Sequence, residues 1–458
     1  MSAGERPTAL AEFKVARPEL EARFAVAKGH VDRLKTYFYG DTGYERGAGD
    51  PDLYKYFCQR YRALIRPGGS LAVVLPRSAF SAKGSTDFRV WLFSSTTVER
   101  LDFLLNNRRW MFDTHPQYTV ALLQASIGSA VALDTVEVAG VAAAESEFVV
   151  QSREPGIRVA LNALGPLREV PLVSNQPEAD LLGQLRVGTA FVYGGGRWRC
   201  FPTRELHETD DKELWEGATS GRPLWKGESF DQFDPHGHEA RFCPETDDVI
   251  ARARRSRPGA ESTLARELSL TVRRAAAESE ASHARVVFRD VTNRTNSRTV
   301  LAALAPSTTF LLNSAPYLVF VQGTDLDRAC CLGLMNSVPF DWQARRYVET
   351  HVSYFILEGL RFPALDDDAY AAIATAAARL SCPDERFAAF AEATGVEVGP
   401  LHPEERDALR AEIDALVARA WDLDADDLET IFADFTLDAV PEPYRQSVRD
   451  RFAELQRG

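Results

Sequence analysis

The chain has 458 residues, of which 45% are hydrophobic and 26% are charged, and this length suggests two to four domains with a sizeable core. No apolar run approaches the roughly 18 residues that span a membrane, and the N-terminus lacks the hydrophobic segment of a signal peptide. We therefore expect a cytoplasmic protein with no membrane partner, in which six cysteines without paired spacing are reduced and mostly buried.

The net charge of −13 is concentrated at the C-terminal end of the chain. Residues 361–458 contain 10 basic and 22 acidic residues, a balance of −12, which leaves a balance of −1 for the first 360 residues. Because arginines cluster locally in this nearly neutral part, the acidic total does not exclude nucleic-acid binding.

Residues 1–48 predict a polar, mainly helical lead-in. A further helix is expected to end at Pro67-Gly68-Gly69, because glycine adopts the left-handed dihedrals that close a helix. The continuously apolar run Leu71–Leu75 predicts a parallel strand that is buried on both faces and ended by proline. Ligands of such sheets bind beyond the carboxyl ends of the strands, so Pro76–Lys83 is expected to contribute to function.

Two more strands are predicted at Val98–Leu105 and Tyr118–Leu123, and the loop between them contains Trp110-Met111-Phe112. From its residue type alone, Phe112 is predicted to belong to the core. Residues 126–165 indicate a short β region and a linker, and a new region is expected to begin near Pro166.

The second half of the chain contains patterns that imitate nucleotide and metal sites. The three glycines within Tyr193–Arg199 favour a tight hairpin over a phosphate-binding loop, because a strand is expected to follow them. His236, His238 and Cys243 have no fourth ligand at a usual spacing, so no metal site is expected. The arginines within Arg252–Arg257 suit either a phosphate-facing patch or a solvated helix face.

A β-branched strand beginning at Arg285 is predicted to lead into a polar loop. Arginine can pair with guanine or phosphate, asparagine can pair twice with adenine, and threonine hydroxyls reach phosphates, so this loop suits DNA. The alternative is a loop that its own Asn and Thr side chains hold together. The polar residues of this segment are Arg289, Thr292, Asn293, Arg294, Thr295, Asn296, Arg298 and Thr299.

The rest of the chain is predicted to be helical and acidic. Glu404–Trp421 carries apolar residues at helical spacing behind Pro403, and Asp424 is placed to cap a following helix.

Several of these segments, in this order, resemble one family of enzymes. Leu-Tyr-Lys-Tyr-Phe (53–57), Arg-Pro-Gly-Gly-Ser-Leu-Ala-Val-Val-Leu-Pro (66–76) and Phe-Ser-Ala-Lys-Gly (80–84) resemble DNA methyltransferases that modify the exocyclic amino group of adenine. Relatives of this kind include type IIG restriction–modification enzymes and the methylases of the BREX and DISARM phage-defence systems. Leu-Trp-Lys-Gly (224–227), the Arg285–Pro306 segment and Cys331–Arg346 resemble the target-recognition domain of this family, the last as a helix-turn-helix.

The resemblance implies roles for particular residues. In this family an aromatic side chain on the hairpin after Val98–Leu105 stacks on the target base, which must leave the duplex to react. Phe112 best matches that position, with His115 and Tyr118 as alternatives. DNA-binding roles are implied for Lys83, Lys226, Arg289, Thr292, Asn293, Arg294, Thr295, Arg298, Asn336, Arg345 and Arg346.

Two parts of the family pattern are missing from the chain. It has no early strand followed by a glycine-containing loop for S-adenosyl-L-methionine, and no Asn-Pro-Pro-aromatic tetrapeptide. Asn313–Tyr317 and Asn336–Phe340 imitate the tetrapeptide, but each has an extra residue and lacks one proline. No catalytic, cofactor-binding or metal residue is therefore assigned. The complete enzyme would use S-adenosyl-L-methionine and no metal, bound outside this chain, either before Met1 or on a separate partner chain.

The expected fold is α/β: the back half of a Rossmann-like methyltransferase domain, an α/β target-recognition domain and a helical C-terminal tail. The expected divisions are residues 1–48 as the lead-in, 49–165 as the catalytic-domain half, 166–365 as the recognition domain and 366–458 as the acidic tail.

The expected function is part of a site-specific DNA adenine methyltransferase of a restriction–modification or phage-defence system, which binds double-stranded DNA and other defence proteins. The alternatives are a stand-alone DNA-binding specificity subunit without enzymatic activity and an inactive truncated product. A methyltransferase half should expose an unpaired sheet edge at residues 71–75. A binding subunit should instead be a stable monomer whose DNA affinity falls with salt.

Overall fold

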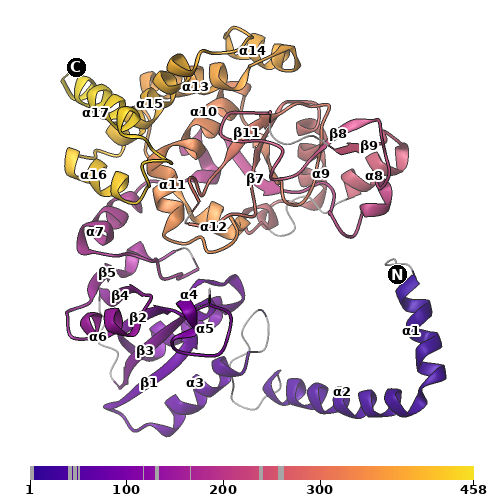
Figure 1. Ribbon diagram of the computed structural model, residues 1–458, viewed down its shortest axis with the longest axis vertical. Coiled ribbons are helices and arrows are strands. Elements are labelled where there is room, and N and C mark those ends of the chain that lie inside the picture. Colours follow the sequence, from indigo (N-terminus) through magenta and orange to yellow (C-terminus); the bar gives the residue numbers. More distant parts are fainter. Residues whose placement is uncertain are drawn as a thin grey trace. The chain divides into compact units, whose positions relative to one another are not determined.

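The computed structural model describes residues 5–39, 44, 49, 52–116, 118–128, 134–165, 167–236, 241–255, 262–294 and 296–457. The chain forms two compact units, Met1–Val170 and Pro171–Gly458, called unit 1 and unit 2 here (Figure 1). The finer division into four functional parts stays a prediction. No helix in the described part of the chain is long and apolar enough to cross a bilayer.

Unit 1 contains one sheet and a set of short helices. Its strands are β1 (Gly69–Pro76), β2 (Thr97–Leu105), β3 (Thr119–Ile127), β4 (Thr135–Ala142) and β5 (Ile157–Ala160). Its helices are α1 (Glu5–Ala16), α2 (Pro18–Tyr39), α3 (Leu53–Leu64), α4 (Ser78–Ser81), α5 (Thr86–Ser95) and α6 (Glu145–Gln151), with 3-10 turns η1 (Lys83–Ser85), η2 (Asn107–Arg109) and η3 (Leu161–Ala163).

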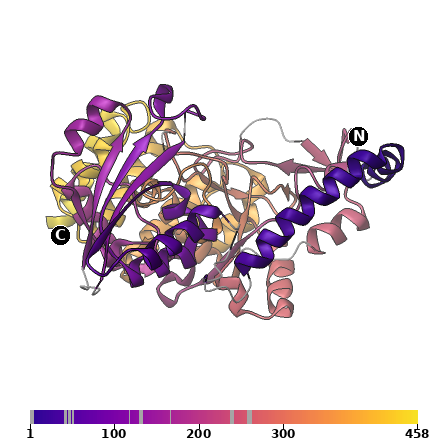
Figure 2. The same cartoon turned by 90° about the horizontal axis from the view of Figure 1, so that it is seen from below.

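The five strands of unit 1 are ordered β1-β3-β2-β4-β5. Figure 2 shows strands of this sheet side by side. Since β1 and β2 are both antiparallel to β3, they are parallel to each other. β4 is parallel to β2, and β5 is antiparallel to β4. The chain crosses from β1 to β2 through α4, η1 and α5, so β3 is inserted between the two strands of a crossover unit.

The prediction that Leu71–Leu75 forms a parallel strand buried on both faces was wrong. β1 pairs antiparallel with β3 at the edge of the sheet, with Leu75 opposite Ala121. Its side chains alternate between buried and open positions, so Leu71 and Leu75 are buried whereas Val74 is 51% exposed. The physical reason is that a continuous apolar run specifies neither the direction of its neighbour nor a cover for both faces.

The lead-in is helical, as its sequence indicates. α1 and α2 are successive helices that meet at Arg17, and many of their apolar side chains are exposed, Val15 most of all. At the end of α2, Phe38 stacks on Tyr56 of α3 with 4.3 Å between ring centroids. This aromatic contact joins the lead-in to the first helix that packs on the sheet.

Unit 2 contains three small sheets. Their strands are β6 (Thr189–Ala190), β7 (Arg199–Thr203), β8 (Arg222–Trp225), β9 (Arg241–Cys243), β10 (Arg285–Phe288), β11 (Ala302–Ala305), β12 (Phe310–Leu311), β13 (Tyr317–Gln322) and β14 (Arg361–Phe362). They form a four-stranded sheet β11-β10-β13-β7, a three-stranded sheet β12-β8-β9 and the pair β14-β6. A shared core that includes Trp225, Phe230, Val287 and Tyr317 joins the first two sheets.

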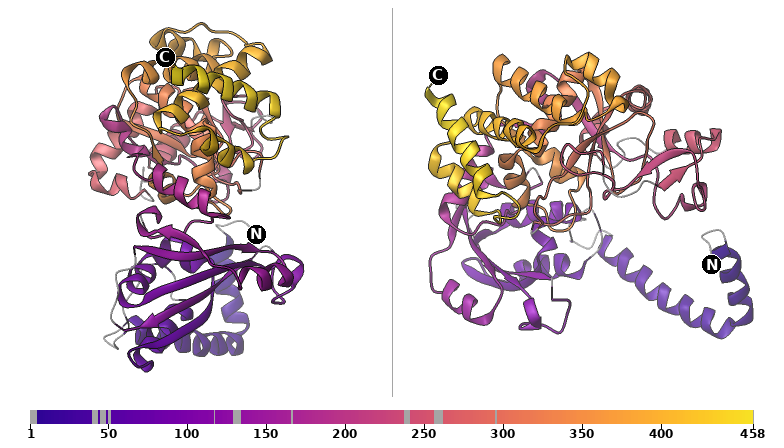
Figure 3. Two further views of the ribbon diagram at one scale, coloured as in Figure 1. Left: turned by 90° about the vertical axis from the view of Figure 1, so that its left-hand side faces the viewer. Right: turned by 45° about the horizontal axis from the view of Figure 1, so that its top comes forward.

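Helices surround these sheets and make up the C-terminal part of unit 2 (Figure 3). Buried α10 packs against α13, which packs against α15, while α15 packs against α17 and α16 against α7. The predicted mixed α/β class with a helical C-terminal region is confirmed. The helices are α7 (Gln176–Leu185), α8 (Asp247–Arg255), α9 (Leu270–Glu280), α10 (Asp325–Asn336), α11 (Val338–Arg345), α12 (Tyr354–Gly359), α13 (Asp367–Ser381), α14 (Ala388–Thr394), α15 (Pro403–Ala420), α16 (Ala425–Ala433) and α17 (Glu442–Arg457), with 3-10 turns η4 (Phe191–Gly196), η5 (Lys212–Leu214), η6 (Leu264–Glu267) and η7 (Glu385–Phe387).

The hairpin predicted around the three glycines was wrong. This segment is the 3-10 turn η4, and the flanking strands pair elsewhere, β6 with β14 and β7 with β13. Gly194 has a positive φ of 53°, and a Cβ there would collide with the ring of Trp198. The glycine run therefore lets the backbone approach a buried tryptophan.

All six cysteines lie in the described part of the chain, and each is buried and free, as predicted. Burial raises the pKa of Cys58 to about 12 and that of Cys382 to about 12. Since only the thiolate is a good nucleophile, these thiols are structural.

Candidate nucleic-acid interface

The loop between β2 and β3 is folded around one asparagine. Asn106 is fully buried, and its Nδ2 donates to the carbonyl of Phe112 at 2.8 Å and to Oγ1 of Thr114 at 3.1 Å. Its Oδ1 accepts from the backbone N–H of Met111 at 3.2 Å and of Phe112 at 3.1 Å. The backbone on both sides of Phe112 is thus held by a single amide.

The loop base is closed by two further contacts. The backbone N–H of Asn106 donates to the carbonyl of Tyr118 at 2.9 Å, and the Trp110 indole donates to the carbonyl of Leu105 at 2.8 Å. Arg108 and Arg109 have positive φ angles of 55° and 60°, an uncommon conformation for non-glycine residues. These two residues lie in a loop whose backbone is held by the hydrogen bonds of Asn106 and Trp110.

The aromatic side chains of this loop point outward. Phe112 is 45% exposed and Tyr118 is 62% exposed, so the core interpretation of Phe112 was wrong. His115 is exposed as well, and its ring lies 5.7 Å from that of Tyr118. The structure therefore brings the three predicted base-stacking candidates together on one loop of defined backbone, and their stacking role stays a prediction.

Lys83 lies in the segment that follows β1. It begins the turn η1 and is half-buried, and its carbonyl accepts from Oγ1 of Thr86 at 2.7 Å. Fully buried Arg89 supports the segment by donating to the carbonyl of Ala79 at 3.1 Å and of Ala82 at 2.9 Å. Burial lowers the pKa of Arg89 to about 10, so this guanidinium stays charged at neutral pH while it holds the segment.

In unit 2, Arg289 connects two of the predicted recognition segments. Its Nε donates to the carbonyl of Gly227 at 2.6 Å, and its Nη2 donates to the carbonyl of Phe230 at 2.8 Å. Half-buried Lys226 next to this contact forms an ion pair of 2.5 Å with Glu228. These hydrogen bonds hold the Leu-Trp-Lys-Gly segment and the β10–β11 loop together. The Arg289 guanidinium therefore has partners within the protein.

The β10–β11 loop is tied to α11 by Asp341, which is fully buried. Its Oδ1 accepts from the backbone N–H of Thr299 at 2.8 Å and of Val300 at 2.5 Å. Its Oδ2 accepts from Nε of Arg345 at 3.2 Å and lies 3.7 Å from Nε of Arg298. One carboxylate thus closes the loop and lies close to two guanidinium groups, of whose combined charge it offsets half.

Arg345 completes the attachment of this loop. Its Nη2 donates to the carbonyls of Asn296 at 2.8 Å and Ser297 at 2.9 Å, and its guanidinium lies 4.0 Å from the ring centroid of Phe435. Neighbouring Arg346 donates to Glu178 at 2.7 Å and pairs with Asp434. These contacts join the loop to α7 and to the C-terminal helices.

Five of the residues that were predicted to bind DNA have buried side chains. Thr292, Arg298, Asn336, Arg345 and Arg346 are all buried. Thr292 accepts from the Asn296 side chain at 3.2 Å, and the Asn336 amide pairs with both backbone groups of Ala302. Residue type does not show whether a guanidinium or amide pairs inside the protein. The contact between Asn296 and Thr292 fits the interpretation of a loop that its own Asn and Thr side chains hold together. A DNA-binding role for these five residues stays a prediction.

The helix-turn-helix prediction was correct locally but not in its role. α10 ends at Asn336, Ser337 caps α11, and two helices meet at the predicted turn. Every residue of α11 is buried, so this helix cannot lie in a DNA groove as it stands.

Arg294 and Asn293 are two further residues of this loop that were predicted to bind DNA. Both are half-buried, and no hydrogen bond or ion pair joins the Arg294 guanidinium to another residue that the structure describes. Burial lowers the pKa of Arg294, and the neighbouring charge of Arg346 lowers it further. The carboxylates of Asp434, Glu349 and Glu178 act in the opposite direction and raise this pKa. Thr295 lies outside the described residues.

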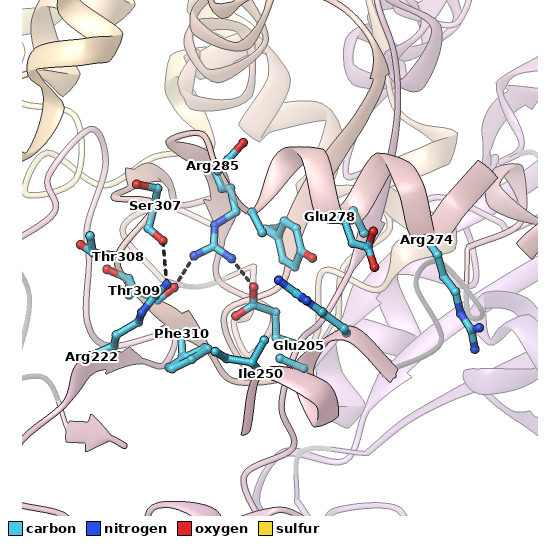
Figure 4. A pocket seen from close by; sticks show the side chains of 16 residues that line it. Glu205, Arg222, Ile250, Arg274, Glu278, Arg285, Ser307, Thr308, Thr309 and Phe310 are labelled. Carbon is cyan, nitrogen blue, oxygen red and sulfur yellow. Dashed lines mark hydrogen bonds and ion pairs between the residues drawn. The ribbon is translucent and has the colours of Figure 1, made fainter. Parts of the chain in front are cut away.

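The structure also contains a cavity that the sequence did not indicate. It has a volume of about 380 Å³ and lies between α8 and α9, where the surrounding segments contribute several arginines (Figure 4). The only hint in the sequence was the arginine-rich segment at the end of α8. No group of three His, Cys, Asp or Glu side chains that could hold a metal ion occurs among the residues described. His238 and Arg257 lie outside them.

No protein-family model matches this chain, and no curated protein does either. Among solved structures, it is similar to the type IIL restriction–modification enzyme MmeI in complex with DNA, with 13% identity and a TM-score of 0.43 over 88% of this chain and 53% of that one. It is also similar to the type IIG restriction endonuclease BpuSI, with 12% identity and a TM-score of 0.31 over 89% of this chain and 50% of that one. The chain spans about half the length of each of these enzymes.

Proposed function

We propose that this chain is the target-recognising and base-flipping part of a site-specific DNA adenine methyltransferase of a restriction–modification or phage-defence system, acting in the cytoplasm. In this proposal, S-adenosyl-L-methionine binding and methyl transfer belong to a further polypeptide segment, within a longer chain or in a separate one. The proposal rests on the ordered motifs of the sequence and on three features of the structure.

The observation that carries the proposal is the exposed ring of Phe112 on a loop of fixed backbone. A phenylalanine that is 45% exposed contributes little to the core, yet buried Asn106 holds the backbone around it with three hydrogen bonds. Such pre-organisation suits a group that must stack on a base as soon as the base leaves the duplex. Base–aromatic stacking contributes about 1–3 kcal/mol, enough to stabilise an extruded adenine.

The second feature is the β10–β11 loop, which is rigid at its base and open at Asn293 and Arg294. Asp341 and Arg345 fix the loop at Asn296 and Val300, and the guanidinium of Arg294 has no hydrogen-bond or ion-pair partner in the described part of the chain. Functional side chains on a supported loop lose little entropy on binding. We assign Arg294 to a DNA phosphate or a guanine edge.

The third feature favours a methyltransferase part over a stand-alone specificity subunit. β1 is the edge of the unit 1 sheet, and among the described residues no strand pairs with its outer side. An open edge with an exposed Val74 is a site for strand addition. We propose that the segment with the S-adenosyl-L-methionine site continues the sheet there.

The test uses 20-base-pair duplexes of random flanking sequence with a central adenine that is either paired or mismatched. A mismatched base costs less to extrude, so a flipping protein binds that duplex more tightly. Phe112→Ala should weaken binding to the mismatched duplex by about 5- to 100-fold, as lost stacking predicts, while Phe112→Trp should retain it. Fluorescence anisotropy measures the affinities.

The matched control is Phe57→Ala, which removes a similarly exposed phenylalanine from α3 of the same unit. It should leave both affinities unchanged. If Phe112→Ala binds both duplexes as the parent does, with an unchanged thermal unfolding midpoint, the base-flipping role is refuted.

A further inference from the structure

The cavity between α8 and α9 is lined by buried side chains on its inner wall and by exposed side chains elsewhere. Its inner wall contains Glu205, Arg285 and Tyr317, which are almost fully buried, while Arg254 of α8 and Arg274 of α9 lie at exposed positions of its lining. Figure 4 shows Arg274 and Glu278 on the same side of the cavity, away from the pair of Arg285 and Glu205. Its volume of about 380 Å³ is within the range of small-ligand sites.

Two of the four arginines in the described lining are already neutralised. Arg285 pairs with Glu205 and donates to the carbonyl of Thr309, and Arg222 pairs with Glu245. These two guanidinium groups therefore contribute fixed donors but little net charge. They also make the inner wall polar. Such a buried polar wall costs free energy if the cavity beside it is apolar.

The other two arginines are uncompensated. Among the residues that the structure describes, Arg254 and Arg274 form no hydrogen bond or ion pair. Glu278 is the single carboxylate of this described lining outside the Glu205 pair, so the excess charge is positive. Arg254 and Arg274 line the same cavity from two separate helices, and guanidinium groups are well suited to bind an anion with several oxygens.

The inner wall adds an unsatisfied donor. The Nε of Arg285 is buried and has no hydrogen-bond partner among the described residues, although Arg285 itself is only 1% exposed. A buried donor without a protein partner can be satisfied by a water, an ion or a ligand in the adjoining space. The hydroxyl-bearing segment Ser307–Thr309 lines the same cavity and provides further donors.

We infer that the cavity between α8 and α9 binds a phosphate group through Arg254 and Arg274. The phosphate belongs either to a free nucleotide or to the backbone of a nucleic acid, because both present the same oxygens to the guanidinium groups. The cavity is too small for a duplex, so from DNA it would take a phosphate with its adjacent nucleoside. The inference does not depend on base flipping by Phe112, which lies in the other unit.

The experiment titrates the full chain with AMP and with inorganic phosphate by calorimetry, and separately with a labelled 20-base-pair duplex. The double variant Arg254→Gln with Arg274→Gln should weaken AMP or duplex binding at least tenfold. Ala281→Trp adds a bulky ring at an exposed position of the lining and should weaken it equally without any change of charge.

The matched control is Arg419→Gln with Arg457→Gln, which removes one positive charge each from α15 and α17, helices that do not line the cavity. Loss of AMP binding identifies a nucleotide site, and loss of duplex binding alone identifies a backbone-phosphate site. The inference is overturned if neither cavity variant changes any of these affinities by more than twofold. Phe112→Ala leaves AMP binding intact, so failure of this inference is distinguishable from failure of the proposed function.

Discussion

The side-chain Nδ2 of buried Asn106 donates a hydrogen bond of 2.8 Å to the backbone carbonyl of Phe112, whose ring is exposed. One residue thus holds the backbone of another residue six places along the chain. This hydrogen bond supports the backbone of the connection between β2 and β3, here called the platform, that carries the Phe112 ring.

Asn106→Ala should release this platform while the rest of unit 1 stays folded. The variant leaves buried backbone groups of Met111 and Phe112 without partners, at a cost of about 1–3 kcal/mol each if they stay buried. We expect faster amide hydrogen exchange in residues 107–116 and weaker binding of mismatched DNA. Asn107→Ala changes the exposed neighbour and should alter neither. Unchanged exchange in the Asn106 variant would contradict the assigned role.

Arg345→Ala should destabilise the protein severely. It leaves the buried carboxylate of Asp341 with one partner fewer and frees the carbonyls of the β10–β11 loop, and loss of one member of a buried pair costs about 3–5 kcal/mol. Urea unfolding followed by circular dichroism measures this change. Arg294→Ala, in the same loop, removes no hydrogen bond or ion pair within the described part of the chain and should stay within about 0.5 kcal/mol of the parent. Equal effects of the two variants would refute the structural role of Arg345.

Val74→Lys should reduce self-association of the isolated chain. The open edge of β1 can pair with another copy, and a charged side chain on an edge strand opposes such pairing. Light scattering across a concentration series should show smaller aggregates for this variant. Val150→Lys makes the same change at an exposed position of α6 and should behave like the parent. A parent chain that stays monomeric at all concentrations would instead favour the stand-alone specificity subunit.

Asp414 should make stability depend on pH. This carboxyl accepts from the backbone N–H of Val338 at 2.7 Å and from the Tyr444 hydroxyl at 2.6 Å, but burial raises its pKa above the ordinary value. The folded state then holds a proton that the unfolded state releases near an ordinary pKa of about 3.9, so the free energy of unfolding falls as pH rises from that point through the raised folded pKa.

Asp414→Asn cannot ionise and should lack this component. The free energy of unfolding of the parent minus that of the variant should therefore decrease as pH rises above about 4 and level off beyond the raised folded pKa. Tyr444→Phe removes a donor that favours the carboxylate, so it should extend the decrease to higher pH. Calorimetric unfolding at several pH values gives these differences, and parallel profiles for parent and Asp414→Asn would contradict the prediction.

The sequence by itself determined the local elements of this protein. The glycine turn before β1 and the two strands around Phe112 occur where their patterns place them, and the helices α10 and α11 meet where the family resemblance implied a turn. Such features depend on side-chain periodicity and on turn residues within a few positions, which a single sequence contains in full.

Only the tertiary structure decided which polar side chains are available to a ligand. Arg345 and Arg294 belong to the same predicted set, yet Arg345 is buried against Asp341, Ser297 and Phe435, whereas Arg294 has no hydrogen-bond or ion-pair partner among the residues described. Likewise, the arginines around the cavity come from strands and helices that are far apart in the sequence. Burial and pairing depend on contacts between distant segments, and residue type does not specify those contacts.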